Sequence, residues 1–137
     1  MTIFGVDIAS GSPHSRQSPS YSLAILDRDA VNCHHMISRH KLTRLIREHQ
    51  PEIVAMDNVH ELASSRRELI DFLRLMPATT KLVQVTGADR PEPLVKVARW
   101  HGITFDRTRS LEEAEACARL AAKGVGAVVS AFEDRTW

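Results

Sequence analysis

The sequence predicts one α/β domain over residues 1–137, in which helices flank a five-stranded mixed sheet. Three short apolar segments come first and are separated by no helix, which indicates an antiparallel meander. Helical and apolar segments then alternate, as is typical of parallel strands joined by helices. The hydrophobic content of 43% and the charged content of 26% are those of an ordinary globular protein with room for one core.

The predicted meander begins with a strand from Ile3 to Asp7. The segment Ser10–Ser20 is rich in Ser and Pro, so we expect a mobile loop that nucleic acid or a partner would order. The second strand runs from Tyr21 to Leu26 and the third from Ala30 to Ile37, with a turn at Asp27–Asp29. Because no helix joins them, these three strands should be antiparallel.

Helical spacing appears next. Ser38 can cap a helix from Arg39 to His49, whose apolar side chains recur at positions three and four apart, and Pro51 stops it. The unbroken apolar run from Ile53 to Asp57 predicts a strand buried on both faces. Further along, the predicted elements are a helix from a Ser65–Glu68 capping box to about Met76, a strand at Lys81–Val85, a helix at Pro91–His101, an extended piece at Ile103–Phe105 and a helix from Ser110 to about Phe132.

Two acids stand where two predicted strands end. Asp7 closes the first apolar run and Asp57 closes the fourth. Open α/β folds place their sites at the carboxyl ends of parallel strands, so the two carboxylates should face each other if the strands are neighbours. Such a pair is costly unless a cation, a proton or a basic ligand compensates it. The sequence therefore predicts a site for a divalent metal ion. Simpler interpretations stay open, with Asp7 capping a turn and Asp57 forming an Asx turn with Asn58.

A third group of acids opens the last predicted helix. With Ser110 as N-cap, Glu113 falls at the third helical position and can complete a capping box. Glu112 and Glu115 are three apart and share a face, so we expect them to be the better metal candidates, Glu115 above all. The alternative is that all three acids only suit the positive end of the helix.

The order of these elements resembles the ribonuclease H-like superfamily. The stretch Phe4–Gly11 is similar to the first strand of the Holliday-junction-resolvase branch, and Ile53–Asn58 to its acid-bearing fourth strand. Glu112–Ala116 resembles the acid-and-alanine opening of the final helix of that branch. The segment Leu111–Phe132 is closer still to an uncharacterised archaeal family that carries a resolvase-like nuclease domain.

The resemblance implies a hydrolase that cleaves phosphodiester bonds of structured nucleic acid with Mg²⁺ or Mn²⁺. Two ions would lie on a carboxylate cluster, with Asp7 bridging them and Asp57 and Glu115 beside it. Glu112 is a further catalytic candidate. The branch usually carries Glu at the position of Asp57 and Asp at that of Glu115, so each side chain differs in reach by one methylene.

Candidate phosphate contacts are Arg107 and Arg109, which immediately precede the acids of the last helix. Basic residues also gather on the first predicted helix, where a solvated face is the default interpretation. The net charge is only +1, so no overall basic field points to nucleic acid. Aromatic residues make up 5%, which argues against a stacking platform for single strands.

Rival functions remain. The chain could be a catalytically inactive domain of the same fold that binds nucleic acid or a protein, or an actin-like nucleotide-binding fold lacking its second lobe. Cys33 and Cys117 form no metal motif and fit a reduced, cytoplasmic setting. No apolar run is long enough to span a membrane, so we expect no membrane association. A homodimer is left open, as is a longer chain with further domains.

Overall fold

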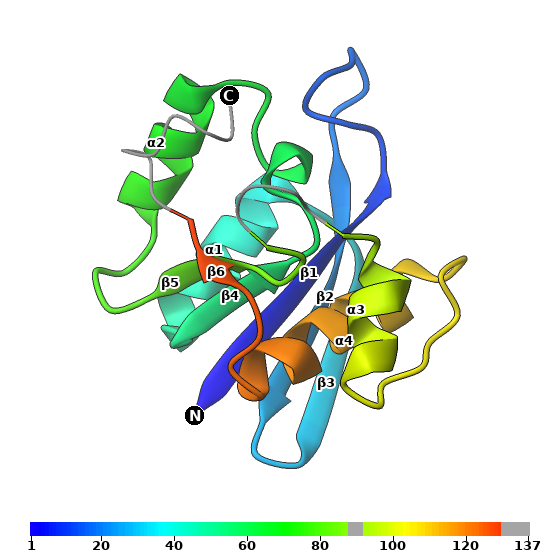
Figure 1. Ribbon diagram of the computed structural model, residues 1–137. Helices are drawn as coiled ribbons and strands as arrows, with labels where there is room; N and C mark the ends of the chain where they lie inside the picture. The colour runs from blue at the N-terminus through cyan, green and yellow to red at the C-terminus, as the bar shows by residue number, and fades with distance from the viewer. Residues whose placement is uncertain (88–91, 130–137) are drawn as a thin grey trace.

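The computed structural model describes residues 1–87 and 92–129 and contains a six-stranded mixed sheet (Figure 1). The strands are β1 (Thr2–Ser10), β2 (Ser20–Asp27), β3 (Ala30–Ser38), β4 (Ile53–Met56), β5 (Lys81–Gln84) and β6 (Ala127–Val128), in the spatial order β3-β2-β1-β4-β5-β6. Strands β1, β2 and β3 form the antiparallel meander, while β4 and β5 continue the sheet parallel to β1. The predicted α/β class with a mixed sheet is confirmed. The predicted count of five strands is wrong, because β6 pairs antiparallel with β5.

Helices cover both faces of the sheet. One hydrophobic cluster joins α1 (Arg39–His49) and α2 (Arg66–Leu75) to one face. A second cluster joins α3 (Leu94–Trp100) and α4 (Ser110–Ala122) to the other. A short 3₁₀ helix, η1 (Val59–Glu61), follows β4. None of the helices described is long and apolar enough to cross a membrane.

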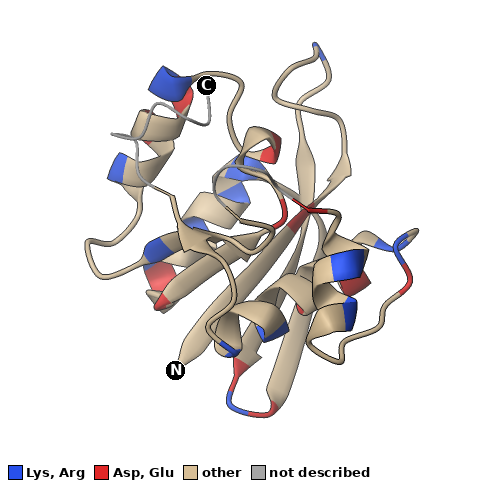
Figure 2. Cartoon of the chain, viewed as in Figure 1, with Lys and Arg blue, Asp and Glu red and all other residues tan. Residues whose placement is uncertain are grey.

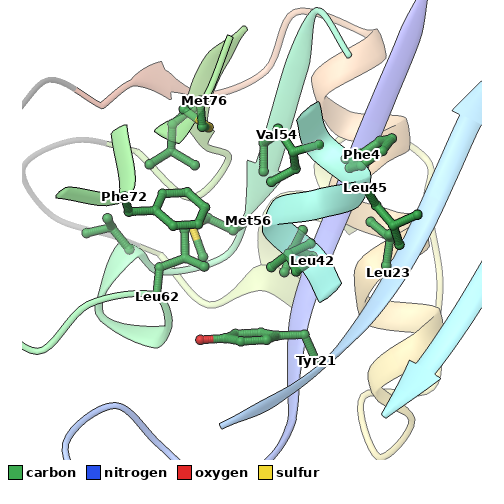
Figure 3. Close-up of a cluster of buried hydrophobic side chains, with 14 of the residues drawn as sticks. Phe4, Tyr21, Leu23, Leu42, Leu45, Val54, Met56, Leu62, Phe72 and Met76 are labelled. Atoms are coloured by element: carbon green, nitrogen blue, oxygen red, sulfur yellow. The ribbon is translucent and has the colours of Figure 1, made fainter. Parts of the chain in front are cut away.

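The first two helices start where their capping residues predict. Ser38 accepts a hydrogen bond from the backbone N–H of Lys41, and α1 spans Arg39–His49 as predicted. Ser65 accepts from the N–H of Glu68, whose carboxylate in turn accepts from Ser64 N. The core between these helices and the sheet contains Tyr21 and Phe72, with other large apolar side chains around them (Figure 3).

The second half departs from the prediction at two places. The last helix ends at Ala122 and not near Phe132, since Gly124 and Gly126 adopt φ of 80° and 110° and turn the chain into β6. The end of that predicted helix, 130–132, lies outside the described residues, as does the predicted start of α3 at Pro91. Ile103–Phe105 belongs to no strand and packs its apolar side chains on the second cluster.

The last helix, α4, lies unusually close to β1. A Cβ atom added to Gly5 would overlap the carbonyl oxygen of Ala114 and lie 2.8 Å from the backbone nitrogen of Ala118. The helix face turned to the sheet carries small buried residues, including Cys117 and Ala121. Gly5 and this face let α4 rest on the first strand next to the point where Asp7 ends the apolar run.

The β1–β2 loop, residues 11–19, is held mainly by its own hydrogen bonds. Ser12 N donates to Gln17 O, and Ser10 and Ser20 hydroxyls lie 2.6 Å apart where the strands enter the loop. Within the described part of the chain, the ring of His14 links the loop to η1, through a hydrogen bond with the carbonyl oxygen of His60 and a contact with the His60 ring. The loop adds no side chain to either hydrophobic cluster.

Candidate metal centre

The carboxyl edge of β1 and β4 brings the two predicted strand-end acids together. The strands are parallel neighbours in which Val6 lies beside Met56, so Asp7 and Asp57 come next along the chain at the same edge. Asp7 shares the α4 side of β1 with Ile3 and Gly5, because side chains alternate along a strand. Figure 2 shows acidic positions meeting there, near the middle of the molecule.

Glu61 completes the group. One carboxylate oxygen from each of Asp7, Asp57 and Glu61 lies within 4.8 Å of the other two. Asn58 caps η1 by accepting from His60 N at 2.9 Å, which turns Glu61 back toward β1. Its carboxylate then accepts from the backbone N–H of Ile8 at 3.3 Å. No pattern in the sequence indicated Glu61 as a site residue.

Side chains from two strands, β2 and β5, hold the backbone of η1 in place. The Tyr21 hydroxyl, on a side chain buried in the core, donates to the carbonyl oxygen of Glu61 at 2.8 Å. Gln84 of β5 accepts from the N–H of Val59 at 2.9 Å. Glu61 therefore lies on a short helix held by β2 and β5, and its carboxylate is bound to β1 through Ile8 N. These contacts give the carboxylate a defined position beside Asp7 and Asp57.

From α4, Glu113 reaches the same group and hydrogen-bonds to the side chain of Asp7. Two carboxyl groups can form that bond only if they share a proton. The predicted capping box of Ser110 and Glu113 is therefore wrong. Arg109 is the N-cap residue and gives no side-chain cap bond, while the Ser110 hydroxyl lies 2.6 Å from that of Ser22 on β2.

The structure places Glu112 and Glu115 away from this group. Glu115 lies 3.3 Å from the guanidinium of Arg119 one turn further along α4. Burial, and after it the charge of Glu115, raises the pKa of Cys33 on β3. Glu112 accepts from Asp106 N and lies 3.8 Å from Arg109. At about 100° per residue, a helix that turns Ala114 and Cys117 to the sheet places Glu113 beside that face, roughly 70° from its middle, whereas Glu115 and Glu112 lie roughly 130° and 170° from it.

Burial and mutual repulsion keep protons on these acids. Burial raises the pKa of Asp57 to about 6, and the charge of Glu113 adds to the rise. Burial is also the largest cause of the well-raised pKa of Asp7, which is 3% exposed, and of Glu61. The Asp7–Glu113 hydrogen bond further raises the pKa of Asp7. Burial and the negative charges around each carboxyl group therefore favour its protonated form. A bound cation would compensate the same charges.

The donor set suits a hard divalent cation. The three grouped side chains offer only carboxylate oxygens, the ligands that Mg²⁺ takes, and Mn²⁺ accepts the same set. Asp7, Asp57 and Glu61 would hold such an ion. Glu113 could join them once its shared proton leaves.

The predicted phosphate contacts lie beside α4. Arg107 and Arg109 are exposed on the segment before the helix, whose first turns carry Ser110 and Glu113 to the sheet. The side chain of Arg109 is 3.8 Å from Glu112. Both arginines thus flank the end of α4 that approaches the acid group.

Comparison with protein-family models, with curated proteins and with solved structures gives no match to this chain.

Proposed function

We propose that this chain is a ribonuclease H-like domain that hydrolyses phosphodiester bonds of structured nucleic acid with Mg²⁺ or Mn²⁺. The observation that carries the proposal is the convergence of Asp7, Asp57 and Glu61 at the carboxyl edge of the sheet. The order of the first five strands and the meander before the first helix are compatible with that fold. When bound, the cations would activate water and stabilise the leaving oxygen.

The residues of the chain would divide the remaining work. Asp7 lies between Glu61 and Glu113 and would be the central ligand, with Asp57 beside it. The Asp7–Glu113 proton must be released before both carboxylates can face a cation, and the raised pKa of Asp7 means that Asp7 would keep this proton in the metal-free protein. Arg107 and Arg109 would bind phosphate groups and position the substrate, as such contacts do in general.

A second candidate is a non-catalytic module of the same fold that binds nucleic acid or a protein partner. The observation that favours it is the same shared proton, which compensates the buried Asp7 without any metal. The two functions differ in a single assay. A nuclease should cleave junction, duplex or hybrid substrates with Mg²⁺ or Mn²⁺, whereas the binding module should retain them intact. Absence of cleavage on every substrate would exclude the catalytic proposal.

Metal-free protein should lose stability as the pH rises from about 4 to about 8. The raised pKa of Asp57, about 6, means that folding takes up a proton between the unfolded value near 4 and that pH. Stability therefore falls as pH rises through this window, and Glu61 extends it upward. We expect a loss of roughly 1–3 kcal/mol, measured by thermal melts.

Adding Mg²⁺ or Mn²⁺ at about pH 8 should restore much of that stability and should change little at pH 5, where protons already compensate the acids. The control is Asp57→Asn, which should flatten the pH dependence. A melting temperature that ignores both ions at pH 8 would remove the support for a metal site.

The contrast between two glutamates of α4 tests which one serves the site. Glu113→Gln keeps a hydrogen-bond donor toward Asp7 but cannot become a carboxylate, so cleavage should fall by at least about tenfold. Glu115→Gln breaks only the exposed contact with Arg119 and should leave cleavage within about twofold. The opposite ranking would mean that α4 presents its other face to the acids.

A further inference from the structure

A basic groove lies between α1 and the C-terminal end of α2, on the sheet face opposite α4. Its volume is about 1160 Å³, above the roughly 300–1,000 Å³ of common small-ligand pockets. The α1 side supplies Arg39, His40, Thr43, Arg44, Arg47, Glu48 and Gln50, and the α2 side supplies Arg74, Leu75, Met76 and Pro77. Charged side chains make up four of the seven residues on the α1 wall.

The groove is much more basic than the chain as a whole. Four arginines line it against one glutamate, while the whole chain carries 18 basic and 17 acidic residues. Arg39 is paired with Glu68 and Arg44 with Glu48. Arg47 and Arg74 form no ion pair with any residue that the structure describes, and both are exposed. The guanidinium groups of Arg47 and Arg74 can therefore bind a ligand at the end of the groove formed by the last turns of α1 and α2.

The basic side chains of α1 follow the groove lengthwise. Arg39, Thr43 and Arg47 recur at four-residue intervals, and His40 and Arg44 form the adjacent row. From Arg39 to Arg47 the helix rises about 12 Å, which corresponds to roughly three or four phosphates of one nucleic-acid strand. Guanidinium groups bind phosphate oxygens through paired N–H donors.

The groove begins near the acid group. Strand β3 runs parallel to β1, because both are antiparallel to β2, so α1 starts at the edge of the sheet where β1 and β4 end. Arg39 at that start contacts Glu68 in the first turn of α2. Figure 2 shows basic positions on α1 and along α2, well separated from the arginines before α4. The groove thus leads from the carboxyl edge along the far face of the sheet.

We propose that this groove binds the phosphate backbone of nucleic acid, as a second contact surface besides Arg107 and Arg109. The proposal takes its ligand class from the proposed function but does not depend on cleavage. An acidic protein segment would use the same charges, and the experiment below separates the two.

The test is binding of labelled duplex, four-way junction and RNA–DNA hybrid in EDTA, at several salt concentrations. Arg47→Ala with Arg74→Ala should weaken binding of the preferred probe roughly tenfold and reduce the slope of log K against log salt by about two. Both side chains are exposed and unpaired, so the melting temperature should stay near that of the original chain. The matched control is Arg28→Asn with Arg99→Ala, which removes the same charge from a hairpin turn and from α3 and should change binding little.

An equal loss of binding in the control variant would show a general charge effect and would overturn the proposal. So would unchanged binding by the groove variant, no binding of any probe, or groove-dependent binding of polyglutamate alone. Cleavage is scored separately with Asp7→Asn. If the protein binds nucleic acid through the groove but cleaves no substrate, the groove proposal stands and the nuclease proposal fails. If it cleaves and the groove variant binds as well as the original chain, the nuclease proposal stands and the groove proposal fails.

Discussion

Replacing Gly5 with alanine is expected to destabilise the protein by at least about 3 kcal/mol, a fall of roughly 10 °C in melting temperature. The added Cβ would overlap the carbonyl oxygen of Ala114 and crowd the backbone of Ala118. Both obstacles are main-chain atoms of a regular helix, so no side chain can turn aside, and α4 must move off β1. That movement would carry Glu113 away from Asp7, so any cleavage should fall too.

Gly102→Ala provides the control for Gly5. No atom lies within 4 Å of its added Cβ, but its φ of 74° is unfavourable for alanine. The expected cost is about 1 kcal/mol from the backbone alone. A Gly5→Ala protein that melts no lower than the control would mean that α4 does not rest directly on the first strand.

The second large effect is expected from Asp7→Asn. The change removes a buried charge site and keeps the shape, and the new amide can donate to Glu113 in place of the shared proton. At about pH 8 without metal, we expect equal or greater stability, by up to roughly 3 kcal/mol. Cleavage should drop by more than about 100-fold, because even outer-shell partners of metal ligands cost 10–100-fold.

Asp71→Asn, on the exposed side of α2, is the matched control and should change neither stability nor cleavage. Nucleic-acid binding should survive Asp7→Asn, whereas Arg107→Ala with Arg109→Ala should weaken binding and flatten its salt dependence. An Asp7→Asn protein that still cleaves, or that is clearly less stable at pH 8 without metal, would contradict the proposed role of the acid group.

Capping residues and apolar patterns predicted the helices and strands that depend on neighbouring residues in the sequence. The apolar stripe and the Ser38 cap located α1 to the residue, and the apolar runs located β1 and β4, although β1 continues past Asp7 to Ser10. The parallel pairing of those strands then explains why Asp7 and Asp57 meet. Strand β6 was missed because two residues carry too little pattern, and two glycines with positive φ create its approach.

The identity of the other acids depended on tertiary geometry. Spacing alone favoured Glu112 and Glu115, but the position of α4 is set by the close approach of its backbone at Ala114 and Ala118 to Gly5. The stripe of small residues was the available signal, because Glu113 lies one turn before Cys117 at its border. Glu61 lies on a single 3₁₀ turn held by side chains from β2 and β5, which no local pattern predicts.

The position of α4 also bears on how the chain folds during translation. This helix packs mainly on β1 and β2, although about 80 residues separate it from the end of β2. At 5–20 residues per second, the ribosome needs roughly 4–16 seconds to supply it. Until then the apolar side of the first hairpin lacks its cover and the acids lack Glu113. The first hairpin is therefore the part of the sheet whose apolar face waits longest for its covering helix.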